Sequence, residues 1–230
     1  MHNYPYHGRM TMTTVEQPGL RERKKRETHD RLRNVALRLA TERGVDQVTI
    51  EDIAAEAGVS TRTFFNYFGS KEEVLVGPDP SSATDLAQAL ADRPAGESPL
   101  ESLRALMLMR SKIITERADD VRARMRLVTA YPALQPRYLT TASAMERVLT
   151  EGIAARTGTD PDADAYPALM AGVASAVMRT TIVSWLAGPG DRPIADLIDE
   201  AFDLIAAGLP APDHAPAQQS HASNKKRTHR

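Results

Sequence analysis

The chain has 230 residues, of which 42% are hydrophobic and 26% are charged, and its formal net charge is −1. This length is sufficient for one large domain or two modest ones, each with a buried core. Cysteine is absent, which excludes disulfides, zinc–thiolate sites and cysteine nucleophiles and fits a reducing cytoplasm.

Charged residues are unevenly distributed along the chain. Residues 21–26 (RERKKR) hold five basic side chains and one acidic, residues 78–213 hold 13 basic and 19 acidic, and residues 214–230 hold four basic and none acidic. A basic segment favours an anionic polymer as a partner, although such runs are usually only solvated surface. The six histidines lie outside the middle of the chain and at no helical metal-ligand spacing, so the sequence predicts no metal site and no cofactor.

The first predicted helix follows an irregular arm. Residues 1–19 show no hydrophobic period and lack the continuous apolar core of a secretory signal, so we expect a disordered arm. A helix is predicted over residues 20–43, ended by Gly44, because apolar residues recur three and four positions apart. This stripe consists of Leu32, Val35, Ala36, Leu39 and Ala40.

Three short helices are predicted next, because each is preceded by a hydroxyl side chain that can cap it. The caps are Thr49 with Asp52 three positions later, Ser60, and Ser70 with Glu73. The middle helix is predicted over residues 61–68, and Gly69 is expected to take the left-handed conformation after it. Residues 48–75 therefore predict helix, tight turn, helix, turn and helix.

The stretch GPDPSS over residues 77–82 breaks the helical pattern, and a domain boundary is predicted there. Only helices are predicted beyond it, over 82–92, 98–118, 120–157 with an interruption at YPALQP, 162–187 and 193–207. The sequence thus predicts an all-α protein of about nine helices. Its parts would be a disordered arm at 1–19, a three-helix helix-turn-helix domain at 20–77, a larger α-helical domain at 78–210 and a disordered basic tail at 211–230.

Residues 167–188 are long enough to span a membrane. Small residues dominate this stretch, and Arg179 lies at its centre, where a charge costs about 2.5–3.5 kcal/mol on insertion. A buried helix of a soluble protein is therefore the favoured interpretation, and no membrane partner is predicted.

Residues 58–74, GVSTRTFFNYFGSKEEV, hold three of the four phenylalanines of the chain. Two short helices joined by an Ala-Gly-Val-Ser turn are typical of a helix-turn-helix. Gly58 would supply the positive φ of the turn and Val59 an apolar plug beneath it. Because Phe64 and Phe68 are four residues apart, both are predicted to face the core beside Ile53 and Leu39.

The other side of this helix carries residue types that contact DNA. Arginine pairs with guanine, asparagine with adenine, the threonine methyl group contacts thymine, and tyrosine binds phosphate. The outward positions are Thr61, Arg62, Thr63, Asn66 and Tyr67, with Phe65 near their edge. The alternative is a small three-helix core with a merely polar outer surface.

The segment TIEDIAAEAGVSTRTFFNYFGSKEEVL resembles the DNA-binding domain of the tetracycline-repressor (TetR) family of bacterial regulators, over about residues 28–76. The matching positions are Thr49, Ile53, Ala54, Gly58, Val59, Ser60, Thr63, Tyr67, Phe68, Lys71 and Glu72. The resemblance implies an all-α homodimer that binds double-stranded operator DNA and releases it when a small-molecule effector enters the C-terminal domain.

Site residues carry over from this family by position. The resemblance implies base contacts by Thr61, Arg62, Thr63 and Asn66, and contacts to the DNA backbone by Thr49, Tyr67 and Lys71. The family often has tyrosine where this chain has Phe65, so a phosphate hydrogen bond is missing there. The basic segment 21–26 can compensate by following the DNA backbone or entering the minor groove.

The second domain resembles a subgroup of the family that is common in actinobacteria and associated with acyl-CoA-like or fatty-acyl ligands. The resemblance covers most of residues 100–208 and rests on YPALQPRYL, ERVLTEGIAARTG, the Trp185 helix and DLIDEAFDLIAAGL. It implies that residues 78–210 form a ligand-binding and dimerisation domain.

An amphipathic ligand needs an apolar wall and a group that meets its charge. Residues of these types on the predicted helices are Leu103, Met107, Arg110, Ile114, Met178, Arg179 and Trp185. A buried guanidinium must be paired. The alternative is that Arg110 and Arg179 lie at the edges of their stripes or pair with a surface acid, and that the apolar residues are plain core.

The last two predicted helices are candidates for a homodimer interface. Small residues over 171–176 permit close approach, and the apolar stripe over 194–205 can pair with its symmetry mate in a four-helix bundle. These interpretations favour a cytoplasmic, ligand-responsive DNA-binding regulator, a repressor released from a palindromic operator. Two alternatives are a helical enzyme, for which the sequence offers no catalytic motif, and a protein-interaction module whose first domain is only structural.

Overall fold

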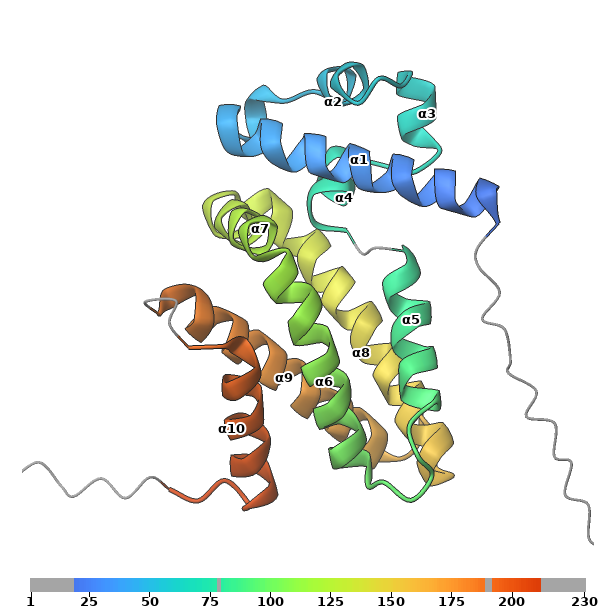
Figure 1. Cartoon of the computed structure of the whole chain (residues 1–230), viewed down its shortest axis with the longest axis vertical. Helices are drawn as coiled ribbons and strands as arrows, with labels where there is room; N and C mark the ends of the chain where they lie inside the picture. The colour runs from blue at the N-terminus through green and yellow to red at the C-terminus, as the bar shows by residue number, and fades with distance from the viewer. Residues whose placement is uncertain (1–18, 78–79, 189–191, 212–230) are drawn as a thin grey trace, which may run out of the picture. The chain divides into compact units, whose positions relative to one another are not determined.

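The computed structural model describes residues 19–77, 80–188 and 192–211. Within these residues the chain forms ten α-helices, two short 3-10 helices and no strand (Figure 1), which confirms the all-α prediction. The α-helices are α1 (Leu20–Arg43), α2 (Ile50–Glu56), α3 (Thr61–Phe65), α4 (Lys71–Val76), α5 (Pro80–Ala91), α6 (Pro99–Glu116), α7 (Ala118–Ala130), α8 (Gln135–Thr157), α9 (Ala165–Ala187) and α10 (Ile194–Ala206). The 3-10 helices are η1 (Val45–Gln47) and η2 (Pro132–Leu134). Apart from Gly19 and Ala211, the predicted arm and tail lie outside the described residues.

Two local predictions need correction. The helix expected over 61–68 ends at Phe65, because the next two amides bond to carbonyls three residues back, Asn66 N to Thr63 O at 3.1 Å and Tyr67 N to Phe64 O at 2.9 Å. Such i→i−3 bonds tighten the end of a helix. Gly69 was expected to be left-handed, but the glycines with positive φ among the described residues are Gly44, Gly58, Gly158 and Gly208.

Packing divides the chain into two compact units. The first contains the chain up to Gln88 together with Glu116–Val148, and the second contains Ala89–Thr115 together with the chain from Leu149 onward. This division differs from the boundary predicted at residue 77, because α7 and η2 pack on helices of the helix-turn-helix. Each unit is described below by itself.

The first unit is built around α1, which packs against α2, α4 and α7. Leu39, Ile53, Phe64 and Phe68 are each at most 2% exposed and belong to one apolar cluster. Burying a side chain of this size contributes about 1.5–3 kcal/mol. The two phenylalanines therefore anchor the recognition helix, as their spacing predicts.

In the second unit, α10 packs against α9. Ile194, Ile198 and Phe202 are each at most 1% exposed. This apolar stripe was expected to meet a partner chain, but the structure buries it within its own chain. On α6, the Arg104 guanidinium donates to Asp199 at 2.7 Å and to Asp203 at 2.6 Å, so it ties α6 to α10.

Helix α9 is long and apolar enough to cross a membrane by length and composition alone, and only 28% of its most apolar window is buried. Its inner face packs in the second unit, where Ala171 and Ala174 are fully buried. Large side chains on other faces are uncovered: Tyr166 is 44% exposed, Leu169 65% and Val183 53%. A single chain therefore leaves an apolar surface of α9 open.

Candidate functional site

The turn between α2 and α3 has the backbone that the sequence predicts. Gly58 has a φ of 68°, in the left-handed region that favours glycine. Its amide donates to Ala55 O at 3.0 Å, and the Val59 amide donates to Ala54 O at 2.9 Å. Val59 is partly buried against the apolar cluster of the first unit. The turn is thus fixed by hydrogen bonds above and by an apolar plug below.

Hydroxyl side chains begin all three short helices. The Thr49 hydroxyl accepts from the Asp52 amide at 3.1 Å, and the Asp52 carboxylate accepts from the Thr49 amide at 3.0 Å, which forms the predicted capping box. These bonds from Thr49 lower the pKa of Asp52 below its ordinary value. Ser60 accepts from the Thr63 amide at 3.1 Å, and Ser70 caps α4 through the Glu73 amide.

The recognition helix α3 has one buried and one open face. Phe64 lies in the core, and its ring meets the exposed ring of Phe65 edge-on, with centroids 5.6 Å apart. Arg62, Phe65 and Asn66 are exposed, with Phe65 at 53%. Thr61, Thr63 and Tyr67 are only partly exposed, since Tyr67 packs against the core and the Thr63 hydroxyl lies 2.8 Å from that of Ser60.

Thr49 and Lys71, two of the residues predicted to contact the DNA backbone, lie together. Both line a shallow hollow of about 450 Å³, together with Gly69 and Ser70. The Lys71 ammonium also makes contacts that the sequence did not predict, because it donates to Val45 O at 2.7 Å and to Val48 O at 2.9 Å. An ammonium has three donors, so one remains for a phosphate.

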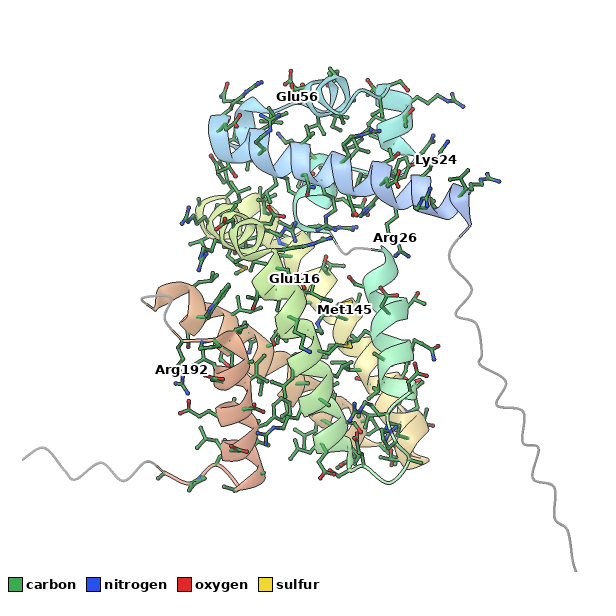
Figure 2. The ribbon with its side chains drawn as sticks, viewed as in Figure 1. Lys24, Arg26, Glu56, Glu116, Met145 and Arg192 are labelled. Atoms are coloured by element: carbon green, nitrogen blue, oxygen red, sulfur yellow. The ribbon has the colours of Figure 1, made fainter. Side chains whose placement is uncertain are left out.

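The basic segment 21–26 forms the first turns of α1. Figure 2 shows Lys24 and Arg26 on opposite sides of this helix, as their separation of two residues requires. Both are exposed, and Arg23 pairs with Glu27 at 3.7 Å in an exposed ion pair. The first turns of α1 therefore present positive charge in more than one direction.

The ligand residues predicted on α6 form part of one stripe. Leu103 is fully buried and Met107 is 3% exposed, whereas Arg110 and Ile114 are only partly buried. Burial lowers the pKa of the Arg110 guanidinium below its ordinary value. Ile113, which the sequence placed on the same side, is instead 52% exposed. Arg110 thus stays a candidate for the polar end of an apolar site.

On α9 the predicted ligand residues do not share one face. Trp185 is 8% exposed and continues the buried line of Val177 and Thr181. Met178 is partly buried, but Arg179 is exposed and lies on the opposite side of the helix from that line. This corrects the expectation of a buried Arg179, and the alternative of a guanidinium at the surface is the one observed.

Two charged residues that the sequence analysis did not single out are buried in the first unit. Arg33 on α1 is 9% exposed, and the Nε atom of Arg124 on α7 is buried without a hydrogen-bond partner. Arg33 stands one turn before the buried residues Leu37 and Ala40, so the helical period carried a signal for its burial. The position of Arg124 depends on the packing of α7 against α1 and had no such signal.

Comparisons with known proteins agree with this geometry. Residues 32–76 match the family model described as bacterial regulatory proteins, tetR family, and residues 97–210 match the one described as MftR C-terminal domain. The chain is 38% identical over 181 residues to the HTH-type transcriptional regulator TcmR of Streptomyces glaucescens, covering 76% of this chain and 80% of that protein. It is 28% identical over 188 residues to MftR of Mycobacterium tuberculosis, a regulator named for mycofactocin biosynthesis, covering 81% and 93%.

Solved structures show the same fold. The crystal structure of Thermus thermophilus FadR, a TetR family transcriptional repressor in complex with lauroyl-CoA, aligns with a TM-score of 0.51 at 23% identity, covering 82% of this chain and 98% of that one. Helix-turn-helix geometry, the N-terminal family match and the relationship to TcmR agree with one another. The chain belongs to the TetR family of bacterial transcriptional regulators, with a DNA-binding helix-turn-helix and a ligand-binding C-terminal domain.

Proposed function

We propose that this regulator is a homodimeric repressor that leaves a palindromic operator when a small amphipathic effector binds its C-terminal domain. The observation that carries this proposal is the open face of α3. Arg62 and Asn66 are exposed there, while Phe64 and Phe68 hold the helix in the core. A rigid helix with free base-reading side chains can enter a major groove without first breaking contacts of its own.

The residues of this face divide into two roles. Arg62 and Asn66 are proposed to read base edges, because their side chains carry the bidentate donors and acceptors that distinguish guanine and adenine. Thr61 and Thr63 lie closer to the protein and would contact bases or sugars at shorter range. Thr49, Tyr67 and Lys71 are proposed to fix the register on phosphates.

The uncovered surface of α9 supports the homodimer. Leu169 and Val183 are more than half exposed, with Val173, Ala176 and Thr180 between them at spacings of three and four. A contiguous apolar face of this kind marks an interaction surface. A two-fold axis beside α9 would cover it with its own copy. Two copies of α3 about one turn of DNA apart, roughly 34–36 Å, would then require a palindromic operator.

The effector class is proposed from the α6 stripe. Leu103 and Met107 offer an apolar wall, and the partly buried Arg110 follows one turn later. A fatty-acyl group fits such a wall, and its anionic end fits the guanidinium. The structural relative from T. thermophilus binds lauroyl-CoA, which supports acyl-CoA thioesters as the first effectors to test. Effector binding would act by favouring a dimer whose two α3 helices are spaced wrongly for the operator.

A footprint of the purified chain on the DNA that flanks its own gene, at near-physiological salt, tests the DNA arm of this proposal. We expect a protected site with two-fold symmetry, and release of that site by lauroyl-CoA but not by free coenzyme A. The variant Arg110→Met should keep the footprint and respond less to the acyl-CoA, whereas Lys112→Met, an exposed cation on the same helix, should behave as the wild type. An asymmetric site bound by a monomer would contradict the dimer, and release that is equal in both variants would contradict the role of Arg110.

A further inference from the structure

Two arginines from different helices come together inside the first unit. Arg33 is on α1 and Arg124 is on α7, and these two helices pack against each other. Arg33 is 9% exposed, and Arg124 is partly buried with its Nε atom closed off from solvent. Two side chains of the same charge thus share a helix contact that is otherwise lined with apolar residues such as Leu127 and Ala36.

The surroundings of Arg124 do not neutralise it. Loss of hydration lowers the pKa of its guanidinium to about 10, and the positive charge of Arg33 lowers it further in the same direction. Asp120 acts the other way, but no described carboxylate lies within ion-pair distance of Arg124, and Arg117 adds another positive charge. Arginine stays protonated in proteins, so this contact holds an excess of positive charge at any ordinary pH.

A buried cation without a partner is strongly unfavourable, and proteins place such groups where a ligand supplies the missing charge. We propose that Arg33 and Arg124 form an anion-binding site at the contact between α1 and α7, and that its ligand is a phosphate or pyrophosphate group. Two guanidinium forks match the charge and the oxygen geometry of such a group better than those of a single carboxylate.

Access and position agree with this assignment. Because Arg124 is partly exposed, an anion can reach its outer edge from solvent without opening the core. Asp120 limits the site to strongly charged anions, because a weakly charged one would gain little against its repulsion. The site is separate from the open face of α3, since Arg33 lies on the same packed side of α1 as Leu37 and Ala40.

Titration calorimetry of the full chain with inorganic pyrophosphate, at a constant ionic strength set with chloride, tests the site. The wild type is expected to bind one pyrophosphate per chain, and Arg124→Met is expected to bind at least tenfold more weakly. Arg126→Met is the matched control, because Arg126 is an exposed arginine on the same helix and its loss removes the same charge. Weak binding by the basic segment 21–26 is common to all three proteins and cancels in the comparison.

Three results would overturn the assignment: wild type that binds no pyrophosphate, Arg124→Met that binds as tightly as the wild type, or Arg126→Met that loses as much as Arg124→Met. Should Arg124→Met fail to fold, Arg124→Lys keeps the charge but loses the planar fork, and unchanged affinity in that variant would count equally against the site. A parallel titration with coenzyme A distinguishes the source of the phosphate. Tighter binding than pyrophosphate, lost in Arg124→Met, assigns the site to a phosphorylated ligand, and weaker binding assigns it to the free anion.

Discussion

Arg137 on α8 donates to Glu73 on α4 across 2.5 Å, and the other carboxylate oxygen of Glu73 accepts from the Gly69 amide at 2.8 Å. Gly69 follows the end of α3 by four residues. One carboxylate therefore joins the segment behind the recognition helix to α8. Because α8 begins in the first unit and continues into the second, this contact lies on a direct chain path between the DNA-binding and C-terminal domains.

Replacing Arg137 by Met should destabilise the protein by about 1 kcal/mol, because Glu73 then loses a charged partner while keeping the Gly69 amide. Both side chains are about one third exposed, which keeps the effect below that of a fully buried pair. Urea unfolding followed by circular dichroism measures it. Arg126→Met, which removes an exposed arginine, should unfold at the wild-type midpoint, and equal midpoints for both variants would show that the ion pair contributes nothing.

The left-handed turn residue gives a prediction with its own internal control. Gly58→Ala adds a Cβ that meets no atom within 4 Å, but at a φ of 68°. Its cost should therefore be backbone strain alone, about 1–2 kcal/mol. Gly96 is equally open and does not have a positive φ, so Gly96→Ala should be neutral or slightly stabilising. Equal changes in the unfolding free energy of the two variants would mean that the turn relaxes without strain.

The parts of the fold that the sequence predicted are those with near neighbours in the chain. The caps at Thr49, Ser60 and Ser70 need only a partner three residues away, so the residue types suffice. The faces of α3 follow from the spacing of Phe64 and Phe68. The end of α3 and the conformation of Gly69 were missed, because Glu73 holds the Gly69 amide and no pattern of residue types encodes that bond.

The contacts that escaped the sequence join residues far apart in the chain. Lys71 bonds carbonyls 23 and 26 positions away, Arg137 meets Glu73 at a separation of 64, and Arg104 meets Asp199 at 95. Each depends on how helices cross, which a helical period does not determine. The same holds for α10, whose apolar stripe is clear in the sequence but whose occupant, α9 of the same chain, was not.

The exposed face of α9 predicts an interface that one substitution should break. Val183→Glu places a charge on a residue that is 53% exposed, so the isolated chain should still fold, while a partner packed on that face would have to bury the carboxylate. Sedimentation equilibrium is expected to change from dimer to monomer. Leu139→Glu on α8 is the control, since Leu139 is 62% exposed and apolar as well. A dimer that survives Val183→Glu, or one that Leu139→Glu also dissociates, would move the interface away from α9.

Arg62 should carry sequence preference as well as affinity. Arg62→Ala is expected to weaken specific operator binding by about 1–3 kcal/mol and to relax the preference at one base pair, because a bidentate base contact is lost. Arg126→Ala removes the same charge from α7 and should leave operator binding as it was. Competition between operator variants in a mobility-shift titration separates the two effects. A uniform loss across all sequences would reassign Arg62 to a phosphate.

Phe65 offers a test in the direction of gain. Its ring is 53% exposed beside Arg62 and Asn66, and it stands where the family often has a tyrosine. If that position faces a phosphate, Phe65→Tyr should add one hydrogen bond and tighten operator binding by about 0.5–1.5 kcal/mol, with little change in its salt dependence because no charge is added. Phe65→Leu, which is apolar and lacks the hydroxyl, should give no gain. Unchanged or weaker binding by Phe65→Tyr would place the ring against a thymine methyl or a sugar, where a hydroxyl finds no acceptor and must lose water to fit.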